Sequence, residues 1–410
     1  MNRIEKLIQK YSTKGVENKE LREIGYLYGG LTGKSKSDFI DGNAKFITYM
    51  NVFTNIEVKT DIDTFVKIGN KEKQNKIEYG DVLFTGSSET PDECGMSSVL
   101  TVKTDEPLYL NSFCFGLRLY HKDLLLPGFL KYLFRDDEIR KQINKTANGV
   151  TRFNISKKLF EKIKIPIPPL PVQQEIVNIL DKFTQLEEEL NAELEARRKQ
   201  YDFYLNQLME SEGKDVEWKT LGEICEFKYG FTDKAQVEGD VRFIRITDIN
   251  EKGKLSDNEY KYIDLTAESQ KYILSKGDIL IARTGATFGK TMLFNKDYPA
   301  VYASFLIRIK FIDKNITPSY YWHFSQSNLY WDQANVLVGG GAQPQFNANA
   351  LKSVQIPIPP ISEQERIVSI LDKFDALVND TKISIPAEIE ARRKQYAYYR
   401  NKLLTFGEYA

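Results

Sequence analysis

A proline-rich segment that occurs twice, each time leading into a long amphipathic pattern, constrains this chain more than any other feature. Each copy opens with Ile-Pro-Ile-Pro-Pro, continues into Leu-Asp-Lys-Phe and closes with the identical residues Glu-Ala-Arg-Arg-Lys-Gln-Tyr. The first copy covers residues 165–201 and the second covers residues 356–396. Identity over seven consecutive residues in a chain of 410 indicates an internal duplication, so the fold must contain two related halves.

Each copy predicts an extended entry followed by a long helix. Proline lacks an N–H and restricts the preceding residue, so the Ile-Pro-Ile-Pro-Pro motif cannot lie inside a helix. Residues 172–209 then repeat apolar side chains at helical spacing, at Ile176, Leu180, Phe183, Leu186, Leu190, Leu194, Tyr201, Leu205 and Leu208. A helix of that length, roughly 57 Å, needs a partner helix, and the second copy supplies one. Two unrelated amphipathic helices are the alternative.

The two helices should differ in one respect. The second copy has four additional residues between Phe374 and Arg392, and this stretch contains Ile385 followed by Pro386. A proline at such a place breaks or kinks a helix. We therefore expect the first helix to be continuous and the second helix to be interrupted.

The segments around the helices are repeated more loosely. Val16–Ile24 is matched 200 residues later by Val216–Ile224, and Gly80–Leu83 is matched by Gly277–Leu280. The helical copies are nearly identical, whereas the globular copies share only scaffold motifs. We infer that the helices have a common role and that the globular parts differ in theirs.

The sequence therefore predicts a mixed α and β protein with a pseudo-two-fold repeat. Two globular domains should be separated by an antiparallel pair of long coiled-coil helices. The expected segments are 1–164 (first globular domain), 165–213 (first helical region), 214–355 (second globular domain) and 356–410 (second helical region).

Runs rich in β-branched and aromatic residues predict strands in the globular parts, and amphipathic runs predict helices. The expected strands are Lys45–Val52, Asp81–Thr85, Val241–Asp248, Asp278–Ala282 and Tyr302–Phe311. The expected short helices lie over residues 1–15 and near Pro127–Asn144 and Pro318–Gln333.

Charge and composition set outer limits. The net charge is zero, but residues 1–164 carry 27 Lys or Arg against 22 Asp or Glu, whereas residues 165–213 carry 4 against 10. A nucleic acid would meet the globular parts rather than the first helix, unless this imbalance is an ordinary fluctuation. No apolar run is as long as a membrane span, and three unclustered cysteines favour a reduced, cytoplasmic setting.

The sequence offers no clear catalytic or metal site. Gly285–Thr291 resembles a phosphate-binding loop, but its glycines are one residue too close for that motif. The two histidines are far apart and have no clustered acids or cysteines. The nearest nuclease-like set, Asp248 with Glu259 and Lys261, is a combination that is common by chance. We therefore expect no catalytic residue and no metal ligand.

The repeated motifs, taken together, carry a family resemblance. Ile-Pro-Ile-Pro-Pro, a Gln-Gln-Glu or Glu-Gln-Glu start, Ile-Leu-Asp-Lys-Phe, and Glu-Ala-Arg-Arg-Lys-Gln-Tyr with its Tyr-rich continuation occur in this order in both copies. This double arrangement resembles the DNA specificity subunit of type I restriction-modification systems. The resemblance covers the whole chain, and the four-residue difference between the helices makes the internal symmetry approximate.

The resemblance implies partners and a division of labour. Each globular domain would be a target recognition domain that reads one half of a bipartite, asymmetric site in double-stranded DNA. The helices would set the unread spacer and dock two modification subunits, which bind S-adenosylmethionine and methylate adenine. A restriction subunit that uses ATP and Mg²⁺ would join them. This chain itself would bind no cofactor and would catalyse no reaction.

Candidate residues for both roles come from the loops and the helices. Loops rich in Gly, Ser, Thr, Lys and Arg suit phosphates and base edges, and they equally suit plain turns. The candidate DNA contacts are Thr32, Lys34, Lys36, Arg152, Arg283, Thr284, Lys290, Gln343 and Gln345. The candidate subunit contacts are Arg197, Arg198, Tyr201, Arg392, Arg393 and Tyr396, with a solvated helix face as the alternative for the arginines. Two other classes stay open, an enzyme with a divergent site and a coiled-coil scaffold that binds no DNA.

The loop after the expected strand Asp278–Ala282 generates one prediction. Replacing Arg283 with alanine should weaken DNA binding by more than about 1 kcal/mol, the scale of a good arginine contact to DNA. Titration of duplex DNA with the wild-type and Arg283→Ala chains measures the difference. Equal affinities of the two chains would indicate that this loop is an ordinary turn without a contact to DNA.

Overall fold

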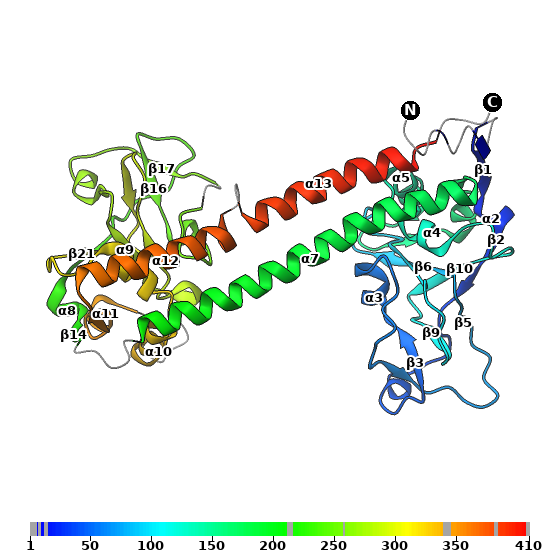
Figure 1. Ribbon diagram of the computed structural model, residues 1–410, viewed down its shortest axis with the longest axis horizontal. Coiled ribbons are helices and arrows are strands. Elements are labelled where there is room, and N and C mark those ends of the chain that lie inside the picture. Colours follow the sequence, from blue (N-terminus) through cyan, green and yellow to red (C-terminus); the bar gives the residue numbers. More distant parts are fainter. Residues whose placement is uncertain are drawn as a thin grey trace. The chain divides into compact units, whose positions relative to one another are not determined.

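The structure is a computed structural model of the chain (Figure 1). It describes residues 6, 10–11, 15–210, 216–256, 259–338, 346–380 and 384–406, so the helix expected over residues 1–15 lies largely outside the described residues. The chain forms two compact units. The first contains Met1–Glu189 and Glu390–Ala410, and the second contains Leu190–Ile389. The segment boundaries expected from the sequence stay predictions.

The first unit combines small sheets with short helices. Its strands are β1 (Glu17–Glu20), β2 (Gly25–Gly29), β3 (Ala44–Ile47), β4 (Phe65–Val66), β5 (Lys76–Ile77), β6 (Val82–Thr85), β7 (Ser87–Ser88), β8 (Ser97–Val99), β9 (Leu108–Leu110), β10 (Cys114–Leu119), β11 (Ala147–Asn148), β12 (Phe153–Ile155) and β13 (Lys164–Ile167). Its short helices are α2 (Leu21–Ile24), η1 (Lys36–Phe39), α3 (Tyr49–Thr54), α4 (Pro127–Leu133), α5 (Asp137–Asn144) and α6 (Lys157–Phe160).

The second unit repeats much of this order. Its strands are β14 (Glu217–Thr220), β15 (Cys225–Tyr229), β16 (Val241–Ile244), β17 (Tyr262–Ile263), β18 (Ile279–Ala282), β19 (Thr291–Leu293), β20 (Ala300–Tyr302), β21 (Leu306–Phe311) and β22 (Gln355–Ile358). Its short helices are α8 (Leu221–Ile224), η2 (Ile246–Asp248), η3 (Ser269–Tyr272), η4 (Gly285–Thr287), α9 (Pro318–Phe324), α10 (Asn328–Leu337) and α11 (Ala348–Lys352).

The sheets confirm that the globular parts are related. The four-stranded sheet β2-β10-β6-β8 of the first unit corresponds to β15-β21-β18-β19 of the second. The parallel pair β3·β9 corresponds to the parallel pair β16·β20. In each unit the repeated proline motif forms the edge strand of a two-stranded sheet, β1-β13 or β14-β22, as its extended backbone requires. The fold class expected from the sequence is therefore confirmed.

Three expected strands are shorter in the structure than the sequence indicated. β3 stops at Ile47, and Thr48 then caps α3 by accepting a hydrogen bond from the Asn51 amide (3.2 Å). β16 stops at Ile244, and η2 follows. The run Tyr302–Phe311 is likewise divided between the end of β20 and β21.

Both short helical runs are also divided by caps. The run Pro127–Asn144 forms α4 and α5, with Asp136 accepting from the Glu138 amide (3.0 Å). The run Pro318–Gln333 forms α9 and the first part of α10, with Ser327 as the cap of α10. Acidic and hydroxyl caps start a new helix wherever their side chains satisfy a free backbone amide.

The long helices agree with the sequence prediction. α7 (Leu170–Met209) is a continuous helix of 40 residues. Its first half belongs to the first unit and its second half belongs to the second unit. The second copy is interrupted, since α12 (Ile361–Asn379) ends before α13 (Ile385–Leu404) begins. Pro386 lies in the first turn of α13, the part of a helix that tolerates a missing N–H.

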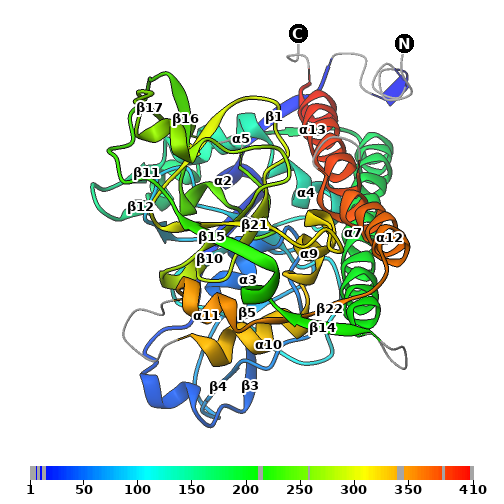
Figure 2. The same ribbon diagram turned by 90° about the vertical axis from the view of Figure 1, so that its left-hand side faces the viewer.

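The helix partners are exchanged between the two copies. In the first unit α7 packs against α13, where Phe183 stacks on Tyr399 with ring centres 5.5 Å apart and an angle of 27°. In the second unit α7 lies beside α12 in both views of Figures 1 and 2, and Phe374 stacks on Tyr204 at 5.4 Å and 27°. The Leu-Asp-Lys-Phe motif of each copy therefore packs on the Tyr-rich end of the other copy.

A fully buried glutamine joins the globular part of the first unit to its long helix. Gln173, near the start of α7, accepts a hydrogen bond from the Leu126 amide (2.8 Å), the residue before α4. Its amide group donates to the carbonyls of Leu124 (3.1 Å) and Pro168 (2.7 Å). The side chain therefore satisfies three backbone groups that have no strand or helix partner.

The second unit repeats this contact. Gln364, also fully buried, accepts from the Thr317 amide (2.9 Å) and donates to the carbonyls of Asn315 (2.7 Å) and Pro359 (2.8 Å). The two glutamines are equivalent, because each is the fourth residue after the Ile-Pro-Ile-Pro-Pro motif of its copy. We call this three-bond contact the glutamine clamp.

The aspartate of Leu-Asp-Lys-Phe provides a second link in each unit. Asp181 accepts a hydrogen bond from Tyr132 Oη (2.6 Å) and forms an ion pair with Lys131 (2.8 Å). Burial, followed by this hydrogen bond, raises the pKa of Tyr132 well above its usual value. Asp372 bonds to Nε2 of the buried His323 (2.8 Å). Tyr132 and His323 occupy the same position, the sixth residue, of α4 and α9.

The glutamine clamp generates a prediction. Gln173→Leu should lower the free energy of unfolding of the first unit by at least about 2 kcal/mol, because one amide and two carbonyls lose their partner in a dry environment. The control is Gln174→Leu, which changes an exposed neighbour whose amide donates to Asn178 within the same helix (2.9 Å). Denaturant unfolding of both variants gives the comparison. An equal effect of the two substitutions would contradict the clamp.

Candidate nucleic-acid interface

The candidate site of the first unit lies where two antiparallel strands meet at one end of the sheet. β6 ends at Thr85 opposite Cys114, the first residue of β10. The next residue, Gly86, donates its amide to the carbonyl of Phe113 (2.7 Å), the residue before β10. The Phe113 side chain is outside the core with 58% of its surface exposed, so its ring is available for contact.

Arg152 lies over this ring. Its guanidinium carbon is 5.5 Å from the centre of the Phe113 ring, a cation–π distance. Its Nε and Nη2 both donate to Ser87 Oγ, at 3.3 and 3.0 Å. Ser87 is buried in β7, which pairs with β12 immediately after Arg152. A ring face and a buried hydroxyl therefore fix the guanidinium plane.

A surface hollow of mixed character adjoins this pair. Tyr49 and Phe53, one turn apart on α3, stack with ring centres 5.9 Å apart, and Tyr49 Oη donates to the Ser87 carbonyl (2.8 Å). Two exposed carboxylates, Glu89 and Glu93, line the same hollow. Aromatic faces, hydroxyls and carboxylates beside an arginine suit the edges of bases better than a phosphate alone.

The second unit presents the same kind of pair. Arg283 follows β18, and its amide donates to the carbonyl of Phe305 (3.1 Å), the residue before β21. Its guanidinium carbon lies 5.2 Å from the ring centre of Tyr229 and 5.7 Å from that of Phe305, and both rings are exposed. Its Nε donates to the carbonyl of Ser304 (3.1 Å). Two rings and one carbonyl therefore fix this guanidinium.

The two arginine–phenylalanine pairs are built from different chain positions. Arg283 occupies the strand-end position that Gly86 holds in the first unit, because both donate their amide to the exposed phenylalanine. Arg152 instead comes from the loop before β12. The repeat Phe-Asn aligns Arg152 with Gln345, which lies outside the described residues. The arrangement is shared by the two units although the arginines that supply it are not equivalent.

Lys34 has a protein partner. Its ammonium forms an ion pair with Glu72 (2.6 Å) and donates to the carbonyl of Lys67 (2.5 Å), and its side chain is only 8% exposed. Hydrogen bonds to Glu72 from the Gly69 amide, and then from Lys34, lower the pKa of Glu72 to about 2. This lysine therefore holds a loop together, and its role at DNA stays a prediction.

The other loop candidates have varied surroundings. Lys290 forms an ion pair with the exposed Glu251 (2.6 Å). The backbone amide and carbonyl of Thr32 both bond to the Gln74 side chain, and the carbonyl of Thr284 accepts from Thr287 Oγ1. Lys36 is exposed at the start of η1. Two candidates lie outside the described residues: Gln343 and Gln345.

The helix candidates fall into two groups. Tyr201 is buried in the core of the second unit, and Tyr396 packs on Tyr132 in the first unit with ring centres 6.4 Å apart. Burial raises the pKa of both tyrosines. The four arginines bond to side chains of the same unit: Arg197 to Glu193, Arg198 to Glu195, Arg392 to Gln395 and Arg393 to Glu187.

Two exposed aromatic residues on the helices were not singled out from the sequence. Phe203 on α7 and Tyr398 on α13 are 61% and 60% exposed. They hold the same place in the two copies, two residues after the repeated Glu-Ala-Arg-Arg-Lys-Gln-Tyr. The Tyr-rich continuation of the motif was the available signal, but periodicity alone did not separate its inward and outward members.

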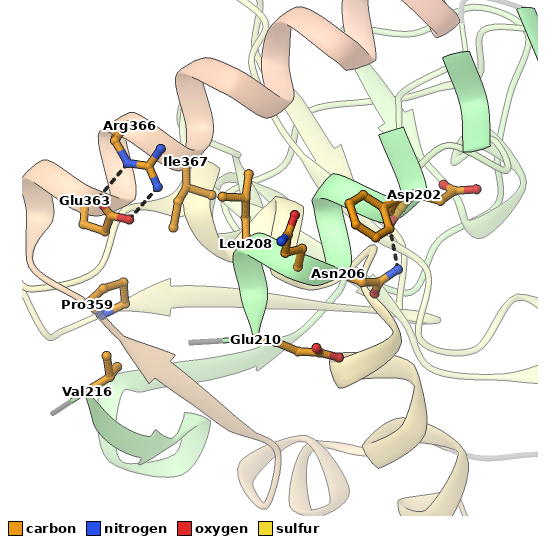
Figure 3. A pocket seen from close by; sticks show the side chains of 11 residues that line it. Asp202, Asn206, Leu208, Glu210, Val216, Pro359, Glu363, Arg366 and Ile367 are labelled. Carbon is orange, nitrogen blue, oxygen red and sulfur yellow. Dashed lines mark hydrogen bonds and ion pairs between the residues drawn. The ribbon is translucent and has the colours of Figure 1, made fainter. Parts of the chain in front are cut away.

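Phe203 borders a hollow between the end of α7 and the start of α12 in the second unit (Figure 3). Figure 3 shows Leu208 of α7 pointing toward Ile367 of α12. Beside them, Arg366 and Glu363 form a two-bond ion pair at 2.8 Å. The hollow is therefore lined by both apolar and charged side chains, a mixture that protein–protein contact surfaces also have.

The structure gives Asp248, the first residue of the nuclease-like set, an ordinary structural role. Asp248 is buried and accepts hydrogen bonds from the Arg245 backbone amide (2.7 Å) and guanidinium (2.9 Å), which closes η2. Within the described ranges, no group of three or more His, Cys, Asp or Glu side chains is placed to hold a metal ion. In the same part of the chain, no helix has the length and apolarity needed to span a bilayer.

Comparisons with known proteins agree with this architecture. The chain is 36% identical over 265 residues to the EcoR124I/EcoR124II type I restriction enzyme specificity subunit of Escherichia coli, which covers 60% of this chain and 63% of that one, less than two thirds. It is 36% identical over 271 residues to a protein of Haemophilus influenzae assigned as a type I restriction enzyme specificity subunit, covering 63% and 68% of the two chains.

Solved structures show the same fold. The S subunit of a type I restriction-modification system from M. genitalium superposes with a TM-score of 0.54 at 15% identity, covering 95% of this chain and 96% of that one. A chain from a structural study of type I complex assembly and conformational transition superposes with a TM-score of 0.67 at 16% identity, covering 95% and 97%.

The family model described as the type I restriction modification DNA specificity domain matches residues 13–196 and again residues 213–391. The two matches correspond to the two internal copies and together cover most of the chain. This chain therefore belongs to the family of type I restriction-modification DNA specificity proteins.

Proposed function

We propose that this chain is the DNA-reading subunit of a cytoplasmic type I restriction-modification complex and that it is itself non-catalytic. The observation that carries this proposal is the exposed arginine–phenylalanine pair at equivalent strand ends of both units. Arginine presented beside an aromatic face is a common means of holding nucleic acid. Family membership supports a role in DNA recognition, and the two arginine–phenylalanine pairs are the proposed contacts with DNA.

Each unit reads one half of a bipartite site. The two units share a scaffold, but Arg152 and Arg283 come from different positions and have different neighbours. The hollow beside Arg152 contains two carboxylates, whereas Arg283 lies against two rings. Different neighbours select different base sequences, so the two half-sites differ and the whole site is asymmetric.

The helices dock two copies of one modification subunit. Phe203 and Tyr398 expose an aromatic ring at the same place in the two copies of the motif, and equivalent surfaces bind equivalent partners. Aromatic residues are enriched in the central part of such contacts. S-adenosylmethionine belongs to these partners, while ATP and Mg²⁺ belong to a restriction subunit. Double-stranded DNA and these subunits are the ligands of this chain.

The test is a methylome measurement in a host that carries this chain with its modification subunits. We expect one methylated-adenine motif made of two short half-sites and an unread spacer. Inserting four residues into α7 should lengthen the spacer and leave both half-sites unchanged, because the insertion adds about 6 Å of helix. Methylation without a bipartite motif would contradict the proposal, and an unchanged spacer would remove the spacer role of α7.

A second prediction concerns the docking surface. Phe203→Ala and Tyr398→Ala should each reduce the amount of modification subunit that copurifies with the chain, and the double variant should reduce it further. Truncating an exposed aromatic anchor commonly costs about 2 kcal/mol of binding. Lys199→Ala, an exposed change on the same helix as Phe203, is the control. Full copurification with the double variant would refute docking at these rings.

A further inference from the structure

We propose that Arg152 and Arg283 each read a guanine, one in each half of the target, and that Phe113 and Phe305 hold the guanidinium planes for this purpose. The inference rests on the proposed function and deepens it. It assigns a base to a residue in each unit and predicts one G·C pair in each half-site.

The first argument is the set of hydrogen-bond donors left on each guanidinium. An arginine has five N–H groups. In Arg152, Ser87 Oγ accepts from Nε and from Nη2. In Arg283, the Ser304 carbonyl accepts from Nε. Within the described part of the chain, Nη1 of each residue has no protein acceptor, so the outer edge of the fork is available in both units.

The second argument is the match between this edge and guanine. Guanine displays two adjacent acceptors, O6 and N7, in the major groove, and the outer N–H groups of arginine contact both at once. A fixed plane raises the specificity of such a pair because the fork cannot rotate to accept other geometries. The rings of Phe113 and Phe305, at 5.5 and 5.7 Å, together with the bonds to Nε, provide that fixation.

The third argument separates a base from a phosphate. Glu89 and Glu93 line the hollow beside Arg152, and the Glu93 carboxylate is held there by Ser88 Oγ (3.1 Å) and Thr90 Oγ1 (3.0 Å). Two carboxylates repel a phosphate but do not repel the neutral edge of a base. A glutamate can also accept from the cytosine amino group of the same or a neighbouring pair.

The fourth argument is the independent construction of the two pairs. Gly86 leaves no side chain at the strand end of the first unit, and a Cβ there would lie 2.8 Å from the Phe113 carbonyl oxygen. Arg152 reaches the same phenylalanine from another loop, whereas in the second unit Arg283 stands at the strand end itself. If these arginines only stabilised the fold, there would be no reason for each unit to place an arginine over its equivalent phenylalanine from an unrelated chain position.

The experiment uses the full chain in complex with its modification subunits. Methylome sequencing of the wild type defines the two half-sites. Arg152→Lys keeps the charge but lacks the fork, so it should reduce discrimination for one G·C pair of one half-site about tenfold or more. Arg283→Lys should do the same in the other half-site only. Since each variant leaves the other half-site intact, the unchanged half reports that the chain is folded.

A chemical substitution sharpens the comparison. Replacing the assigned guanine by 7-deazaguanine in a synthetic duplex removes the N7 acceptor alone. Wild-type complex should bind this duplex about tenfold more weakly, and Arg152→Ala, which has no side-chain donor, should bind both duplexes alike. Phe113→Leu, which removes the ring but keeps an apolar side chain, should give an intermediate loss confined to that half-site.

Three results would overturn the inference. A wild-type motif without a G·C pair in one of the halves would exclude guanine reading there. A uniform loss of affinity for all sequences in the lysine variants, with unchanged base preference, would make these arginines phosphate contacts. Equal binding of guanine and 7-deazaguanine by the wild type would do the same. A bipartite motif in any of these cases leaves the proposed function standing, whereas its absence refutes both.

Discussion

The structure depends on a buried amide. Gln173 and Gln364 each tie three backbone groups of a globular part to the start of a long helix, and both are fully buried. A glutamine can do this because it both donates and accepts, and an unsatisfied backbone group in the same place would cost about 1–3 kcal/mol. Each globular part is thereby fixed to a helix end, and its loops are free to vary without loss of that attachment.

The second link shows how much variation the scaffold accepts. The aspartate of Leu-Asp-Lys-Phe meets a tyrosine hydroxyl in one unit and a histidine nitrogen in the other, at the same position of the corresponding helix. The motif residue is identical while its partner differs, which is the pattern expected when one side of a contact belongs to a fixed frame. The arginine–phenylalanine pairs show the same pattern, since the rings of Phe113 and Phe305 occupy matching strand ends while the arginines come from different loops.

The sequence predicted the long helices and their extended entries better than the candidate DNA contacts, for physical reasons. Proline and helical periodicity act locally, so the extended entries, the continuous α7 and the break before α13 could all be anticipated. Lys34 and Lys36 look alike in the sequence, but Lys34 forms an ion pair with Glu72, 38 positions away, and only 8% of its side chain is exposed. The exposure of the Phe113 ring could not be predicted from the sequence, because it depends on where β6 and β10 end in the folded sheet. Tyr201 and Tyr396 turned inward since they continue the apolar stripe of their helices.

The exchange of helix partners has a consequence for synthesis. Leu403 and Leu404 of α13 enter the same hydrophobic core as Leu21 and Phe84, so the first unit is completed by residues that follow the entire second unit in the chain. The second unit is contiguous and can close as soon as it leaves the ribosome. The first must wait, with part of its core uncovered, for contacts separated by more than 300 residues. Completion of the N-terminal unit therefore follows emergence of the whole second unit from the ribosome, and an incompletely covered apolar core is prone to aggregation in the interval.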